Sequence, residues 1–233
     1  MEKQRVYIGR HGKKAKDGES LDIESLPVLY QIGSEGLGDF AASLGYNAKR
    51  AFLRHGKQKR TLYTGRAILA GAYNLVVPKS QEELESQEFL VFPSIEDPRL
   101  AYDSIKSNAE AFKRMGLEPY LEWLVQHPDA DELEGQEITP WNQMLKTGRE
   151  SIRDAITSAN EQKTPLGVII SHAGLTEPLF LALVNTGRQK PLTNPSEIGG
   201  WLPVEGYVLL SLEGDKGEVQ RDNERYKVDL SNL

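Results

Sequence analysis

Short strand-like segments alternate with helical patterns along this chain, and the alternation is the feature that most limits the folds open to it. The strand-like segments are 5–9, 50–54 and 166–174. The helical patterns cover 37–45, 60–75 and 175–185. Because strands separated by helices pair in parallel and leave helices on both faces, the pattern predicts an α/β fold. We expect a three-layer α/β/α sandwich around a mostly parallel sheet.

The middle of the chain has a different character. Amphipathic helical patterns predict a helical insertion over about 104–147, within which 128–140 is an exposed acidic loop. A core helix is predicted over 146–161, and 206–221 is expected to form a hairpin that turns at 214–217. No sharp change of composition divides the chain, so we expect residues 1–233 to form one domain.

Composition excludes several classes of protein. The chain has no cysteine, which rules out disulfides, zinc–thiolate sites and thiol nucleophiles. The net charge of −6 argues against nucleic-acid binding. No apolar run is long enough to span a bilayer, and the first residues lack the apolar core of a secretory signal. We expect a cytoplasmic protein that binds neither membrane nor nucleic acid, and a homodimer is left open.

Basic residues nevertheless gather in two places. The first group follows the N-terminal strand, and the second surrounds the next strand. The two groups consist of Arg10, Lys13, Lys14 and Lys16, then Arg50, Arg54, Lys57, Lys59 and Arg60. Concentrated positive charge in an acidic protein favours a small anionic ligand, although two solvated basic loops would look the same in the sequence.

Ligands of such sheets bind beyond the carboxyl ends of the strands, which makes the residues that follow each strand candidates for a site. Those residues are Arg10, His11 and Gly12, then Arg54, His55 and Gly56, and finally His172, Ala173 and Gly174. Three of the four histidines fall there, whereas His127 is expected on the surface. Because no metal-binding spacing of histidines occurs, neither a metal nor a cofactor is expected.

Arginine beside histidine suits one particular chemistry. A neutral imidazole can attack phosphorus and hold the phosphoryl group covalently. Arginine forks match the geometry of the phosphoryl oxygens and stabilise the charge that develops on them. Cations nearby also lower the pKa of the histidine, which keeps the attacking nitrogen unprotonated. Such a site further needs an acid that protonates the leaving oxygen.

Three segments together resemble the histidine phosphatase superfamily, also called phosphoglycerate-mutase-like. They are "VYIGRHGKK", "RTLYTG" and "VIISHAGLTEPL", in the order that the family has them. The resemblance implies that His11 is the phosphorylated nucleophile and that Arg10, Arg60 and His172 bind the phosphoryl group. It implies substrate contacts from Gly12, Lys13, His55, Ala173 and Gly174. Thr64 lies where the family's threonine helps the helix to pack.

The chain departs from the family at the proton donor. The family's "Leu-x-Glu" is matched by Leu100 and Tyr102, so Asp103 is the expected donor, or else Glu96. The mutase-like "Glu-Ser-x-x-Asn" pattern is missing after the first motif. The resemblance therefore implies a phosphomonoesterase that forms phosphohistidine on a small phosphorylated substrate. A weak or inactive binder of phosphorylated ligands, a regulatory phosphatase and a phosphoglycerate mutase remain alternatives.

Overall fold

A seven-stranded sheet forms the centre of the computed structural model, which describes residues 3–77, 79–80, 83, 92, 94–101 and 108–233. The strands run in the order β3-β2-β6-β1-β7-β8-β9. Their bounds are Lys3–Arg10 (β1), Ala51–His55 (β2), Ser94–Glu96 (β3), Leu166–Ser171 (β6), Tyr207–Glu213 (β7), Lys216–Arg221 (β8) and Glu224–Asp229 (β9). The first four strands in this order are parallel, and the last three join antiparallel.

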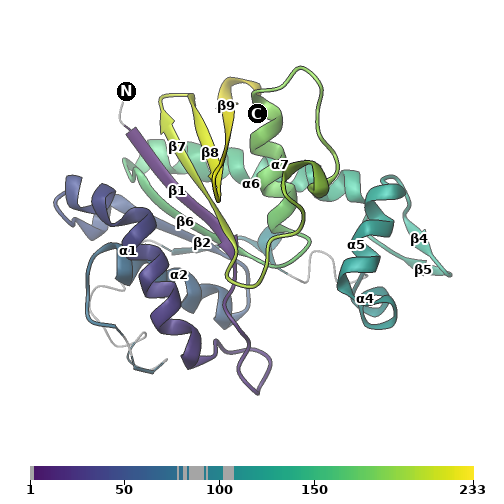
Figure 1. Ribbon diagram of the computed structural model, residues 1–233, viewed down its shortest axis with the longest axis horizontal. Helices are drawn as coiled ribbons and strands as arrows, with labels where there is room; N and C mark the ends of the chain where they lie inside the picture. The colour runs from purple at the N-terminus through teal and green to yellow at the C-terminus, as the bar shows by residue number, and fades with distance from the viewer. Residues whose placement is uncertain (1–2, 78, 81–82, 84–91, 93, 102–107) are drawn as a thin grey trace.

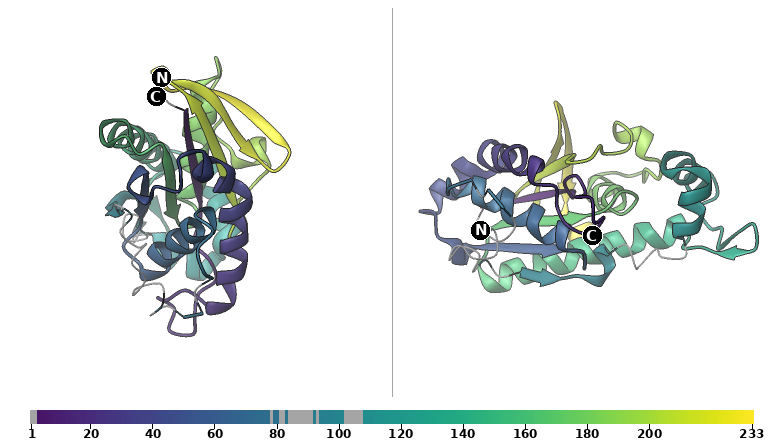
Figure 2. Two further views of the ribbon diagram at one scale, coloured as in Figure 1. Left: turned by 90° about the vertical axis from the view of Figure 1, so that its left-hand side faces the viewer. Right: turned by 90° about the horizontal axis from the view of Figure 1, so that it is seen from below.

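Helices cover both faces of this sheet, as Figures 1 and 2 show. The helices α1 (Leu26–Ser43) and α2 (Lys59–Ala72) pack together on one face, and α6 (Trp141–Gln162) and α7 (Thr176–Thr186) pack together on the other. Side chains alternate along a strand, so β1 sends Tyr7 toward α1 and α2 and sends Val6 and Ile8 toward α7. The predicted three-layer α/β/α sandwich is confirmed.

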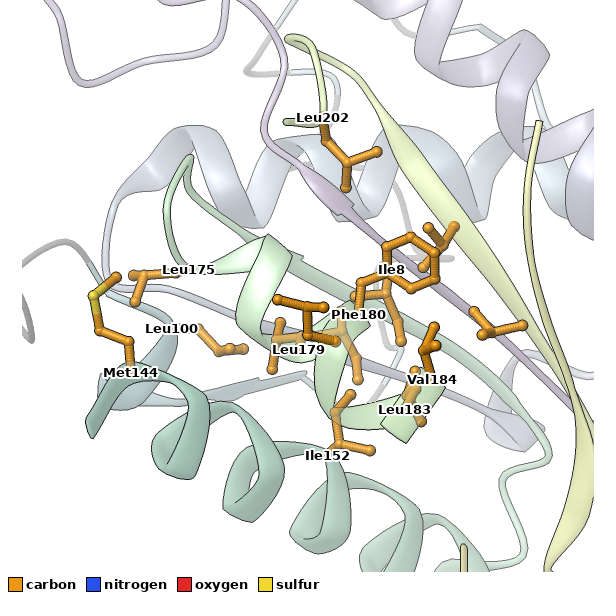
Figure 3. Packing of buried hydrophobic residues seen from close by; sticks show 14 of the residues in the cluster. Ile8, Leu100, Met144, Ile152, Leu175, Leu179, Phe180, Leu183, Val184 and Leu202 are labelled. Atoms are coloured by element: carbon orange, nitrogen blue, oxygen red, sulfur yellow. The ribbon is translucent and has the colours of Figure 1, made fainter. Parts of the chain in front are cut away.

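The helix α7 packs against α6 as well as against strands of the sheet, and its sequence explains why. Almost every residue of "TEPLFLALVNT" is buried, so the helix is apolar on all sides rather than on one stripe. Phe180 and Leu183 pack in a cluster that also contains Ile8 of β1 and Ile152 of α6 (Figure 3). This packing fixes the N-terminal end of α7 directly after the strand that leads to His172.

The predicted helix over 37–45 is part of a longer helix. Gly33 and Gly36 weaken the local signal for a helix before Leu37, because glycine is a poor helix former. In the structure α1 already begins at Leu26, with Pro27 in its first turn. A Cβ atom on Gly33 would lie 1.9 Å from the carbonyl oxygen of Ile68 in α2. The glycine is there because the two helices cross closely.

The insertion carries two short helices, α4 (Ala109–Met115) and α5 (Leu117–Gln126), and projects from one side of the sandwich (Figure 1). The acidic loop predicted at 128–140 contains a small hairpin of β4 (Glu132–Leu133) and β5 (Gln136–Glu137). The core helix begins at Trp141 rather than at Lys146. Trp141 is buried, and its indole Nε1 donates to the carbonyl oxygen of Thr193 at 2.7 Å, so tertiary packing extends the helix.

The hairpin predicted at the C-terminal end is confirmed as β7 and β8, and β9 adds a third strand that was not predicted. The strand β3 was not predicted either. The chain also forms short 3-10 helices, η1 (Ile23–Ser25), η2 (Ala48–Arg50), η4 (Pro98–Leu100), η6 (Pro195–Ile198) and η7 (Leu230–Asn232). Among the described residues, no helix combines the length and the apolar character that crossing a membrane requires.

Candidate active site

The parallel pairing of β1 with β6 brings two of the predicted site residues together. Arg10 is level with Ser171 in the sheet, and the amide of His11 donates to the carbonyl oxygen of Ser171 at 3.1 Å. His11 and His172 each follow at the carboxyl end of their strand. Their rings meet edge to face, with 4.9 Å between the centroids and 63° between the planes.

The backbone fixes the tautomer of His11. Its Nδ1 lies 2.6 Å from the carbonyl oxygen of Gly12. A carbonyl oxygen can only accept, so Nδ1 carries the hydrogen and Nε2 keeps its lone pair. Burial lowers the pKa of His11 to about 3, helped by the positive charges of Arg60 and Arg10, although the bond to Gly12 acts in the opposite direction. The imidazole is therefore neutral, with a nucleophilic Nε2, over the ordinary pH range.

His172 is held by a residue that the sequence did not single out. The Nε2 of His172 donates to the side-chain oxygen of Gln58 at 2.7 Å. Gln58 lies immediately before α2, two residues ahead of Arg60. Burial lowers the pKa of His172 well below its usual value, and His11 and Arg60 add to the effect. Nothing in the local sequence marks a glutamine at a helix start as a partner for a histidine more than a hundred residues away.

Arg60 and Arg10 enter the site from two different elements. Arg60 lies in the first turn of α2. Its Nη1 donates to the carbonyl oxygen of Gly18 at 2.8 Å. Arg10 ends β1, and its Nη1 donates to the carbonyl oxygen of Leu202. Burial lowers the pKa of Arg10, which the carboxylate of Glu177 partly offsets. Both guanidinium groups are thus fixed by backbone oxygens.

Thr64 does more than help α2 to pack. Its Oγ1 accepts from the amide of Gly12 at 3.0 Å and donates to the carbonyl oxygen of Arg60 at 2.7 Å. One hydroxyl thereby joins the turn that carries His11 to the helix turn that carries Arg60. The geometry that the site needs between these two side chains depends on this buried contact.

These side chains surround a cavity of about 510 Å³. Its lining consists of Arg10, His11, Gly12, Lys13, Lys14, Arg60, Leu117, His172, Ala173 and Val204. Eight of these ten come from the basic segments and histidine turns that the sequence singled out; Leu117 from the insertion and Val204 from the segment before β7 do not. No carboxylate lines the cavity among the described residues, and no group of His, Asp and Glu there could hold a metal ion.

The second Arg-His-Gly occupies a different level of the sheet. His55 pairs with Ile170 and is therefore level with Gly9, not with His11. Its Nδ1 contacts the carbonyl oxygen of Gly56 at 2.7 Å, the same local geometry that His11 adopts. The structure does not place His55 in the lining of the cavity, nor Gly174, whose amide donates to Glu177 at 2.9 Å.

Of the expected proton donors, Asp103 lies outside the described residues. Glu96 is the last residue of β3, where it is exposed and paired with His55 in the sheet. Burial lowers the pKa of His55, and the charge of Glu96 partly offsets this. Asp97 is buried in an ion pair with Arg54 at 3.3 Å and also contacts Arg99. None of the described carboxylates therefore lines the cavity.

Glu177 is buried at the start of α7, and the backbone uses both of its oxygens. They accept from the amides of Gly174 at 2.9 Å and Leu202 at 3.0 Å. Burial raises the pKa of Glu177, while these bonds and Arg10 act against the rise. The carboxylate thus joins the turn after His172 to the segment that contacts Arg10.

Comparison with solved structures confirms the fold that the motifs predicted. A structure described as mycobacterial hydrolase 2 superposes with a TM-score of 0.53 at 14% identity over 98% of this chain and 93% of that chain. A protein from Escherichia coli assigned as an alpha-ribazole-5'-P phosphatase superposes with a TM-score of 0.53 at 11% identity over 95% of this chain and 96% of that chain. A phosphoglycerate mutase from Bacillus anthracis superposes with a TM-score of 0.49 at 11% identity, over 99% of this chain and 95% of that chain. No protein-family model matches the sequence, and no curated protein matches it by sequence similarity.

Proposed function

We propose that this chain, which has the histidine phosphatase fold, is a phosphomonoesterase that forms a phosphohistidine intermediate at His11. The observation that carries the proposal is the state of the His11 ring. Its Nδ1 hydrogen is directed to the carbonyl oxygen of Gly12 at 2.6 Å, which leaves Nε2 unprotonated at the wall of a cationic cavity. A neutral, oriented imidazole beside two arginines is what attack on phosphorus requires.

In the proposed reaction, Nε2 of His11 forms a bond to phosphorus as the bond from phosphorus to the leaving oxygen breaks. The leaving oxygen keeps the electron pair and takes a proton from an acid. Water then gives a proton to the deprotonated acid as it attacks the phosphohistidine, the nitrogen–phosphorus bond breaks, and inorganic phosphate leaves with His11 and the acid restored. Asp103 remains the proposed acid, with Glu96 as its alternative.

Arg10, Arg60 and His172 have the proposed role of binding the phosphoryl oxygens. All three line the same cavity as His11 and come from three separate parts of the chain. Arg60 stands at the N-terminal end of α2, where the helix dipole disfavours a cation unless an anion is close by. A phosphoryl group held between the two arginines would supply that anion.

A second candidate function is a binder of phosphorylated ligands with little or no turnover. It is favoured by the absence of any carboxylate from the cavity lining within the described residues. Without an acid, departure of an alkoxide is slow, whereas a good leaving group such as p-nitrophenolate needs no proton. The ratio of the hydrolysis rates of alkyl and aryl phosphates therefore measures how much an acid in the site assists the leaving group.

The first test is hydrolysis of p-nitrophenyl phosphate by the wild type and the His11→Ala variant. We expect the variant to lose at least about a thousandfold in kcat, because it lacks the nucleophile. His127→Ala serves as the matched control, since His127 is exposed and stacks on Trp123 far along the insertion. Equal rates in wild type and His11→Ala would refute the assignment.

A second measurement separates enzyme from binder. Protein denatured at alkaline pH during turnover should carry a phosphoryl group on the peptide that contains His11, and not on the one that contains His55, because the phosphorus–nitrogen bond of phosphohistidine survives base but hydrolyses in acid. A thermal shift with inorganic phosphate, without phosphoryl transfer or hydrolysis, would support the binder instead.

A further inference from the structure

The segment 198–206 contacts the side chain of Arg10, yet most of it is neither helix nor strand. The carbonyl oxygen of Leu202 in this segment accepts from Arg10 Nη1. Gly199 and Gly200 both have a positive φ, of 85° and 81°, and glycine backbone deforms more easily than that of other residues. The orientation of Arg10 therefore depends on the groups that hold this segment in place.

The last residue of β8, Arg221, holds three backbone oxygens of the segment. Its Nη1 donates to the carbonyl oxygens of Ile198 and Gly200, each at 2.7 Å, and its Nη2 donates to that of Trp201 at 3.3 Å. A guanidinium group presents its donors in a rigid plane, so it can bridge several carbonyl groups in one fixed arrangement. Arg221 thereby fixes the backbone that directly precedes the contact with Arg10.

The peptide group between Trp201 and Leu202 is held at both of its polar atoms. Its oxygen accepts from Arg221, and its nitrogen donates to Glu177 at 3.0 Å. The next carbonyl oxygen along the chain is the one that accepts from Arg10. Arg221 is therefore connected to Arg10 through two peptide groups, although β7 separates their two strands in the sheet.

The burial of Arg221 is costly for a residue that only fills space. Its side chain is 8% exposed, and the carboxylate of Asp222, 3.8 Å from Nε, is 89% exposed and well solvated. A buried cation that bonds mainly to backbone oxygens contributes less to stability than a well-packed apolar side chain of similar volume. Its place in the structure is explained if these oxygens must be held for the site.

Arg10 has a donor to spare. Within the described part of the chain, its Nε is buried and has no hydrogen-bond partner, whereas Nη1 is bonded to Leu202. We infer that Arg221 is a positioning residue for Arg10: by holding the segment 198–206 it fixes Nη1, so that the remaining donors of Arg10 face a phosphoryl oxygen. The inference rests on the phosphoryl-binding role that is proposed for Arg10.

A double-mutant cycle tests this inference, with tungstate as a phosphate-sized dianion that undergoes no turnover. Calorimetry would compare the wild type with Arg221→Lys, which keeps the positive charge but loses the planar fork, and with Arg221→Met. We expect each Arg221 variant to bind tungstate about tenfold more weakly. In an Arg10→Met background the same two changes should alter the affinity by less than about twofold, because no guanidinium remains to be oriented.

Arg225→Met is the matched control, since Arg225 lies on the neighbouring strand β9 in an exposed pair with Glu218 at 2.8 Å, and it should bind tungstate as the wild type does. Circular dichroism checks the fold, and Arg221→Lys completes the cycle even if Arg221→Met does not fold.

The inference is overturned if Arg221→Lys binds tungstate as tightly as the wild type, or if its loss of affinity recurs in full in the Arg10→Met background. Failure of the proposed function looks different: Arg221 and Arg10 would still be coupled in tungstate binding, but His11 would acquire no phosphoryl group.

Discussion

Two features of His11 set its chemistry, and they have different origins. The hydrogen bond to Gly12 is local, because it joins neighbouring residues and recurs between His55 and Gly56. The lowered pKa is not local, since burial and the charges of Arg60 and Arg10 cause it. The two Arg-His-Gly tripeptides therefore share the contact between the histidine Nδ1 and the next carbonyl oxygen, but only His11 lines the cavity.

The lowered pKa of His11 makes stability depend on pH. The folded protein protonates His11 only near pH 3, whereas an unfolded histidine has a pKa of about 6.5. Between these values the unfolded state binds the extra proton, so stability falls as the pH drops below about 6.5. When the pH is lowered from 7.5 to 5.0, the free energy of unfolding in urea should fall by roughly 2 kcal/mol more for the wild type than for His11→Asn. Equal losses would contradict the burial of a neutral imidazole.

Gln58 should control the protonation of His172. Gln58→Glu places a carboxylate where the amide oxygen now accepts from Nε2 at 2.7 Å, so the pKa of His172 should rise. Gln58→Leu removes the acceptor and should lower that pKa further. NMR titration of the His172 ring in the wild type and the two variants measures the order of the three pKa values, with the exposed His127 as an internal reference. If His172 titrates identically in all three proteins, the contact does not position it.

Among the helices, the close crossing of α1 and α2 shows how packing overrides local preference. A Cβ atom on Gly71 would lie 1.9 Å from the carbonyl oxygen of Tyr30, and one on Gly33 would lie equally close to Ile68. Neither backbone can yield without moving the other helix. Because α2 carries Arg60 at its first turn, this crossing also sets the position of a site residue.

Gly71→Ala should accordingly destabilise the protein by about 3 kcal/mol, because the added methyl group overlaps a backbone oxygen. Gly38→Ala is the matched control in α1, where the nearest atoms to a new Cβ are 4.0 Å away. That change should stabilise the protein by roughly 0.5 to 1 kcal/mol through helix propensity. Chemical denaturation of the two variants compares them, and a similar effect of both would refute the close crossing.

Across the molecule, Glu177 joins parts of the chain that meet only after folding. The carboxylate accepts from Gly174, which follows His172, and from Leu202, whose carbonyl oxygen accepts from Arg10. The segments that carry Arg10 and His172 are thus connected through a buried acid. Its two backbone partners explain the burial of Glu177.

Glu177→Gln tests this connection. The side-chain amide has one acceptor oxygen in place of two, so one backbone amide loses its partner in a buried setting, at a cost of about 1 to 3 kcal/mol. Glu118→Gln, at an exposed position of α5, should change stability by less than about 0.5 kcal/mol. The free energy of unfolding in urea measures both. An unchanged stability of Glu177→Gln would show that the two amides find other partners.

The strands that lead to Arg10 and His172 could be predicted because apolar, β-branched runs bounded by glycine carry a strong local signal. The motifs at their ends indicated the chemistry, and strand order then brought them together. In contrast, β3 was missed because it has only three residues, all exposed, and β9 because most of its residues are exposed. Both are edge strands, which depend on pairing more than on composition.

Local sequence therefore determined the α/β class, the main strands, and the histidines and arginines that follow them. Only the tertiary structure decided that His11 and His172 face one cavity while His55 lies two residues lower in the register of the sheet, since the register of parallel strands is set by packing of both sheet faces. The tertiary structure also placed Gln58, Thr64 and Glu177 in contact with the candidate site residues or with the turns that carry them. Their roles arise from contacts between residues far apart in the chain, and such contacts form only when the buried polar groups of a folded core must each find a partner.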